Sequence, residues 1–189
     1  IVSPITAVMS AAIPVFSGLL DGETLSLLAI IGMIAAAIAV ILVSQEVNAH
    51  QKVAFSTIAI SLISGTLIGT YLTLIGTSSD DSGIWTATIA RWFSSILVLG
   101  AVLATVRKFE RSSYPWLLVI ISGVLDAAAN GIFQIATQNG MLAIVAVLGS
   151  LYPATTALLA RFILHERLHK IQITGVVLAL AAAVALTLS

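Results

Sequence analysis

Three polar side chains recur at four-residue intervals inside one apolar segment, and they are the first candidates for chemistry. Asp126, Asn130 and Gln134 would share one face of a helix near the middle of its length. A carboxylate there costs about 2.5–3.5 kcal/mol on membrane-insertion scales, so it normally faces a cavity or a partner. We expect Asp126 to bind a cationic substrate group or a coupling proton, with both amides bonding the substrate. Alternatively, the three only join neighbouring helices.

Arg91 is a second charge inside an apolar segment. Arg91 lies near the start of segment 85–106, and Asp126 lies further inside the next segment, 116–137. Antiparallel neighbours would bring both charges to a similar depth, so we expect an ion pair. Arg91 would then hold an anionic substrate group or control access to Asp126, or the pair would be a fixed structural bridge.

Hydroxyl groups flank Pro153 in a later apolar segment. A proline removes a backbone hydrogen bond and can bend a helix beside a cavity. We expect Tyr152, Thr155 and Thr156 to line such a cavity. The alternative is that the Thr hydroxyls bond to carbonyls of the preceding turn.

The stretch from His165 through Glu166 to His169 matches H-E-x-x-H, in which two His bind zinc and the Glu activates water. Residues 170–189 supply no Asp, Glu or His as a third ligand, and the motif falls in a turn between apolar segments. An intramembrane zinc peptidase is therefore the less favoured alternative. We expect no enzymatic activity, no metal and no cofactor.

The composition places the chain in a membrane. Of its 189 residues 59% are hydrophobic and 8% are charged, too few charges to cover a soluble domain. The 8 basic and 8 acidic residues cancel, so a nucleic acid is not expected as a partner. The lack of cysteine excludes disulfides and thiolate chemistry.

Apolar segments of spanning length predict the fold class, an all-α integral membrane protein with seven transmembrane helices. The segments are 1–20, 25–44, 53–75, 85–106, 116–137, 142–164 and 171–189. Alternate loops differ in charge, which would make the basic side cytoplasmic. The basic residues are Lys52, Arg107, Lys108, Arg111, Arg167 and Lys170, and the acidic ones Asp21, Glu23, Asp80 and Asp81.

Two polar turns repeat one pattern, in which a Glu is followed by Leu two positions later and by Gly nine positions later. The matching residues are Glu23, Leu25, Gly32 and Ala36 in the first copy, and Glu166, Leu168, Gly175 and Ala179 in the second. Such a repeat favours a duplicated transporter over a seven-helix receptor. We expect each Glu to cap the helix that follows it.

Small residues recur every four positions and predict close helix packing, since they let backbones approach within a membrane. The stripes are Gly32, Ala36 and Ser44; Ser61, Gly65, Gly69 and Thr73; and Gly175, Ala179, Ala183 and Thr187.

These patterns resemble EamA-type transporters of the drug/metabolite transporter superfamily. The resemblance is carried by residues 3–7 through Pro14 to Gly22-Glu23, by Thr88–Trp92, and by Leu151–Arg161 leading to Glu166 and Gly175. His165 stands where the first turn has Gly22, which departs from the usual Gly-Glu turn.

The resemblance implies ten helices in two inverted repeats of five, of which this chain lacks the first helices. Residues 1–44 would be the end of the first repeat, 45–52 the inter-repeat loop and 53–189 the second repeat. It further implies efflux of a small metabolite, amino acid or drug by alternating access across the cytoplasmic membrane, either coupled to protons or driven by the substrate gradient. The family arrangement would place loop 107–111 outside, so the orientation stays open.

Overall fold

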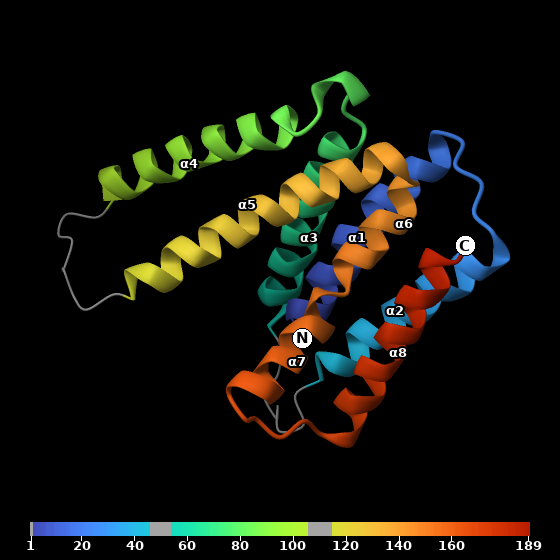
Figure 1. Cartoon of the computed structure of the whole chain (residues 1–189). Coiled ribbons are helices and arrows are strands. Elements are labelled where there is room, and N and C mark those ends of the chain that lie inside the picture. Colours follow the sequence, from blue (N-terminus) through green and yellow to red (C-terminus); the bar gives the residue numbers. More distant parts are fainter. Residues whose placement is uncertain (1, 46–53, 106–114) are drawn as a thin grey trace. The chain divides into compact units, whose positions relative to one another are not determined.

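The computed structural model describes residues 2–45, 54–105 and 115–189, and within them all regular structure is helical (Figure 1). The helices are α1 (Val2–Leu20), α2 (Leu27–Val43), α3 (Phe55–Gly76), α4 (Trp85–Thr105), α5 (Trp116–Asn139), α6 (Leu142–Ser150), α7 (Tyr152–Ile163) and α8 (Lys170–Thr187), with a short 3-10 helix, η1, at Asp80–Ser82. The all-α prediction is confirmed. Residues 46–52 of the predicted inter-repeat loop and the basic residues at 52, 107, 108 and 111 lie outside the described residues.

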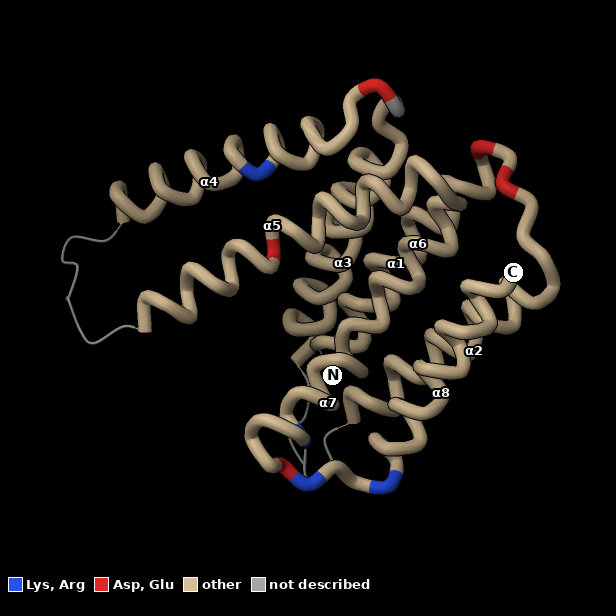
Figure 2. The backbone as a smooth tube through the Cα atoms, in the orientation of Figure 1, with Lys and Arg blue, Asp and Glu red and all other residues tan. Residues whose placement is uncertain are grey.

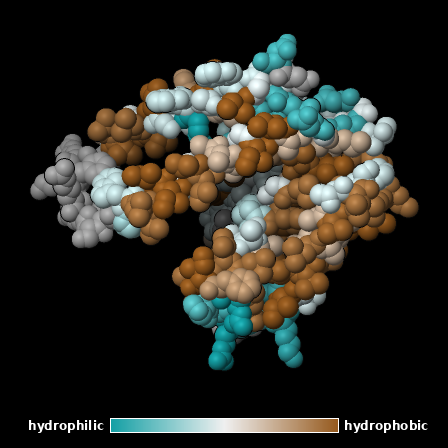
Figure 3. Space-filling view, viewed as in Figure 1, coloured by the Kyte–Doolittle hydropathy of each residue, from teal (hydrophilic) through white to brown (hydrophobic). Residues whose placement is uncertain are grey.

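Six helices are long and apolar enough to cross a membrane, when α6 and α7 are counted as one span. The spans are Ser3–Leu20, Phe55–Gly76, Trp85–Thr105, Trp116–Asn139, Leu142–Ile163 and Lys170–Thr187. The remaining apolar helix, α2, has 17 residues. Apolar side chains cover the visible sides of the helices, as an integral membrane protein requires (Figure 3). The seventh span stays a prediction.

The span at 142–163 is broken at Leu151, between α6 and α7. The Leu151 N–H donates to the Leu148 carbonyl at 3.2 Å, and the Ala154 N–H donates to the Leu151 carbonyl at 2.9 Å. Pro153 lies in the first turn of α7, where its missing N–H costs no helical bond. The helix is thus interrupted next to Pro153, in agreement with the predicted bend, while the cavity expected beside it stays a prediction.

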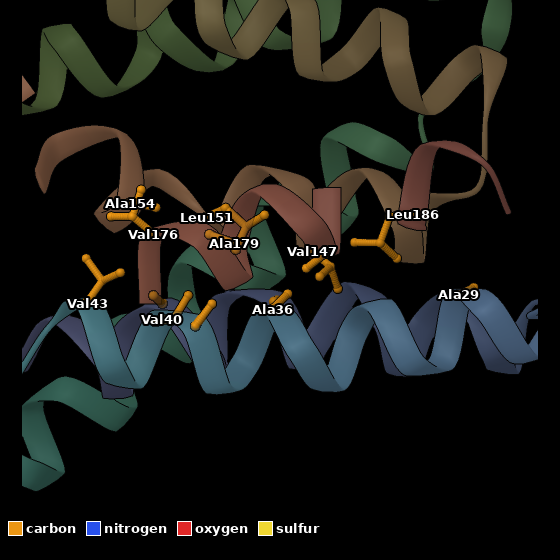
Figure 4. Packing of buried hydrophobic residues seen from close by; sticks show 14 residues of the cluster. Ala29, Ala36, Val40, Val43, Val147, Leu151, Ala154, Val176, Ala179 and Leu186 are labelled. Atoms are coloured by element: carbon orange, nitrogen blue, oxygen red, sulfur yellow. The ribbon is translucent and has the colours of Figure 1, made fainter. Parts of the chain in front are cut away.

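The chain divides into two compact units, Ile1–Leu74 with Gly140–Ser189, and Ile75–Asn139. The core of the first unit consists largely of small residues where α2 packs on α8 and α1 packs on α6 (Figure 4). Ala36, Ala39, Ala179 and Ala182 are all at most 3% exposed there. This is the close packing expected where lipid cannot drive helices together by the hydrophobic effect.

Glycines make the closest of these approaches. A Cβ atom placed on Gly32 would lie 2.9 Å from Cγ of Leu186, and one placed on Gly175 would lie 2.7 Å from the backbone nitrogen of Val43. Gly65 is equally tight against Met9 of α1. The predicted close packing is confirmed. Moreover, Leu186 follows Gly175 by the same interval as Val43 follows Gly32, so the α2–α8 contacts are reciprocal.

Glu23 caps a different helix from the one predicted. Its carboxylate accepts hydrogen bonds from the N–H groups of Leu142 and Ala143, at 2.5 and 3.1 Å, and so caps α6. The helix that follows Glu23, α2, is capped by the Ser26 hydroxyl. The prediction for the following helix was therefore wrong, because Glu23 lies beside α6 and a closer residue satisfies α2.

The second turn is also capped differently from the prediction. His169 and Gln172 form a reciprocal capping box at the start of α8, and Glu166 does not take that place. The two turns nevertheless share a backbone feature, since Gly22 has φ +91° and His165 has φ +56°. The left-handed region favours glycine, and histidine is among the residues that tolerate it. His165 thus keeps the conformation of the glycine that it matches in the repeat.

Candidate functional site

Arg91 of α4 and Asp126 of α5 form an ion pair through Nη2 and Oδ2, as their positions predicted. They are the charged residues that lie away from helix ends in the described ranges, whereas the other described charges gather in turns or at helix ends (Figure 2). Their side chains remain 36% and 57% exposed. The pair is thus accessible from the space beside it.

Gln134 fixes how α5 meets the start of α4. Its side chain is fully buried; its Oε1 accepts from the Ala87 N–H at 3.0 Å, and its Nε2 donates to the Ser78 hydroxyl at 3.0 Å. Ala87 lies one helical turn before Arg91, and Gln134 lies two turns after Asp126. The amide that was predicted to bind substrate therefore holds together the helix ends that position the ion pair.

A cavity of about 710 Å³ opens beside the ion pair, entirely within the second unit. Arg91, Asp126, Thr88 and Ser95 supply its polar groups, and Trp92 is its largest apolar wall. The volume is in the range of small-molecule sites, which are mostly apolar with a few placed polar groups. The cavity can therefore receive a compact organic molecule carrying charge.

The two amides that were predicted to bind substrate do not line the cavity as Arg91 and Asp126 do. Neither Asn130 nor Gln134 belongs to the cavity lining. Asn130 donates from Nδ2 to the Asp126 carbonyl at 2.8 Å, on its own helix. The Nε atom of Arg91 is buried and, within the described residues, has no hydrogen-bond partner. This donor is therefore closed off from the cavity, and Arg91 meets its carboxylate partner through Nη2.

Thr88, Trp92, Ser95 and Gly123 line the cavity but were not among the site residues predicted from the sequence. Their spacing could have identified them. Thr88 and Ser95 lie three before and four after Arg91, and Gly123 lies three before Asp126, so each shares a helical face with a charge.

Tyr152 and Thr156 belong to the first unit, beside the break between α6 and α7. Tyr152 is 46% exposed. The Thr156 hydroxyl donates to the Tyr152 carbonyl at 3.0 Å, which is the backbone bonding given above as its alternative role. Their part in lining a substrate cavity stays a prediction.

Residues 165–169 do not have the geometry that the zinc-peptidase alternative requires. Residues 165–169 are not helical, since α8 begins at Lys170, and His165 has a positive φ. The two histidines therefore do not share the helical face that H-E-x-x-H needs. Within the described residues, no group of three or more His, Cys, Asp or Glu side chains could hold a metal.

Sequence comparison identifies the family. The family model of EamA-like transporters matches residues 55–188, from the start of α3 through α8. No curated protein and no solved structure matches the chain. A multi-pass helical protein with a charged cavity between two of its spans is consistent with this match. The chain belongs to the EamA-like transporter family.

Proposed function

We propose that this membrane transporter exports a small zwitterionic or charged metabolite, amino acid or drug by alternating access across the cytoplasmic membrane. The substrate binds in the cavity between α4 and α5, with its anionic group at Arg91 and its cationic group at Asp126. The observation that carries the proposal is the exposed ion pair lining a cavity between two spanning helices.

The exposure of the pair favours a binding role over a purely structural bridge. Charges inside a membrane are costly and normally face a cavity, a pathway or each other. In the empty cavity each charge neutralises the other. A substrate carboxylate could replace Asp126 on Nη2 of the guanidinium, while a substrate ammonium takes Asp126. Neither charge would then be left unpaired.

A duplicated architecture would provide the two alternating states. The reciprocal contacts of Gly32 with Leu186 and of Gly175 with Val43 support a two-fold relation between α2 and α8. The shared left-handed turns at Gly22 and His165 support the same relation. We therefore retain the proposal of two inverted five-helix repeats, with 53–189 as the second. Protons are the coupling ion that we propose for Asp126, a carboxylate within a span.

Substrate flux in proteoliposomes tests this function, using a panel of amino acids, purines and cationic dyes. Arg91→Gln and Asp126→Asn should each reduce flux roughly tenfold or more, because each removes the charge that strengthens the hydrogen bond to an oppositely charged substrate group. Asp21→Asn, an exposed carboxylate in a turn of the first unit, is the matched control and should leave flux unchanged.

The exchanged pair, Arg91→Asp with Asp126→Arg, separates binding from structure. It should restore the stability lost in the single variants but not the flux, because the substrate charges would meet the wrong partners. Recovery of both stability and flux would show a structural bridge. The Tyr152→Phe and Thr156→Val variants would then test the helix break as the binding place.

A further inference from the structure

A second cavity, of about 400 Å³, lies between α7 and α8 beside the turn that joins them. Arg161 and Arg167 supply its charged part. Its apolar part comes from Leu158 on α7, from Leu168 in the turn, and from Ile173, Val176 and Val177 on α8. This cavity belongs entirely to the first unit and contains none of the residues of the Arg91–Asp126 site.

The position of this cavity is that of a membrane interface. The spans Leu142–Ile163 and Lys170–Thr187 both end at this turn. Arg161 lies in the last turn of α7, so its side chain reaches from the apolar span toward water. In Figures 2 and 3 charged and hydrophilic residues gather at this turn, next to apolar helix surfaces.

The charge of the turn favours an anion. Arg161, Arg167 and Lys170 are opposed by a single carboxylate, Glu166, within residues 161–170. Arg161 donates from Nη1 to the Glu166 carbonyl at 3.3 Å, which anchors one arm of its guanidinium against the turn. Both arginines line the same cavity. Arginine is suited to phosphate because its planar fork donates two parallel hydrogen bonds.

The apolar part of the cavity continues along the surface of α8. Ile173 and Val177 are one turn apart on one helical face, and they are 49% and 61% exposed. A hydrocarbon chain can lie along them while a phosphate remains at the turn. A free phosphate would leave this apolar surface uncovered, whereas a phospholipid matches both parts.

We propose that the cavity between α7 and α8 is a binding site for an anionic phospholipid, whose phosphate is held by Arg161 and Arg167 and whose acyl chain packs on Leu158, Ile173 and Val177. Basic pockets between spanning helices near a membrane surface are suited to such headgroups. The site does not depend on the transport function, because it shares no residue with that cavity.

The test measures phosphatidylglycerol retained by the purified protein in native mass spectrometry, after reconstitution in mixed phosphatidylglycerol and phosphatidylcholine. The wild-type protein should retain phosphatidylglycerol in preference to phosphatidylcholine. Arg161→Gln and Arg167→Gln should each weaken retention roughly tenfold, the value of a lost charge-assisted hydrogen bond. Lys170→Gln removes the same charge at the same turn but lies outside the cavity lining, so it should weaken retention by at most about fivefold, the general attraction of one basic residue to an anionic surface.

A second pair of variants tests the apolar half without altering charge. Val177→Trp should fill the groove and displace the lipid, while Val184→Trp, at a position equally exposed on the same helix but two turns further from the cavity, should not. Equal losses for Arg161→Gln and Lys170→Gln would overturn the proposal and indicate only general surface attraction. Displacement of the lipid by millimolar inorganic phosphate, with Val177→Trp silent, would overturn it in favour of a phosphate site.

Discussion

At the scale of single residues, polar side chains on one helical face have different roles according to their partners. Asp126 and Gln134 share one face of α5, yet Asp126 lines a cavity while Gln134 is fully buried and bonded to two other parts of its unit. Because buried polar groups must find partners, a satisfied amide has little left to offer a substrate. The exposed carboxylate, paired with Arg91, retains that capacity.

Gln134→Ala should therefore act on stability first. It leaves the Ala87 N–H without its acceptor, at a cost of about 1–3 kcal/mol in the free energy of unfolding, whereas the Ser78 hydroxyl still donates to the Ile75 carbonyl. Asn139→Ala removes an exposed amide from the same helix and should cost much less. Unfolding in mixed micelles by denaturant measures both. Loss of flux in Gln134→Ala at unchanged stability would instead support the direct substrate role predicted from the sequence.

At the scale of the helices, the contact that the sequence could not indicate is the one between Glu23 and α6. These partners are about 120 positions apart in the chain. Gly18 permits this contact, because a Cβ there would lie 2.3 Å from the Glu23 carboxylate. Local patterns predict a cap for the next helix, and only the packed structure shows that a more distant helix end lies closer.

Replacing Glu23 should loosen the start of α6. Glu23→Ala removes two hydrogen bonds and a favourable charge at a helix N-terminus, which is worth about 1–2 kcal/mol in the free energy of unfolding. Glu23→Gln should lose less, since its amide oxygen can still accept. The neighbouring Asp21→Asn removes an exposed carboxylate and serves as the control. An equal effect of Asp21→Asn on thermal unfolding would contradict the cap.

The sequence could predict those features that depend on the pattern of apolar residues and on the free-energy cost of placing a charge in a membrane. Apolar length predicted the helices, the depth of Arg91 and Asp126 predicted their ion pair, and Pro153 predicted the break between α6 and α7. The cavity walls and the partners of Gln134 depend on which helices meet, and the sequence of one helix contains no such information. The break also produced one more helix than the apolar segments indicated.

At the scale of the whole molecule, the reciprocal α2–α8 contacts connect the repeat in the sequence with the packing of the first unit. Gly32 faces the flexible end of the Leu186 side chain, whereas Gly175 faces the backbone of Val43. Equivalent positions of the repeat therefore differ in what an added methyl group would meet. A side chain can be shortened or can turn aside, but a backbone nitrogen cannot.

This difference predicts an asymmetric response to equivalent substitutions. Gly32→Ala should cost about 1–3 kcal/mol by overpacking, and Leu186→Ala should recover part of that cost in the double variant. Gly175→Ala should cost at least as much, and Val43→Ala should recover little because the clash with the backbone remains. Gly100→Ala, where nothing lies within 4 Å, should be neutral or stabilising and serves as the control. The double-mutant cycles are measured by thermal unfolding in detergent. Equal rescue in both pairs would mean that α2 and α8 separate enough to relieve a backbone clash, and the close reciprocal contact would then not describe the protein in its membrane.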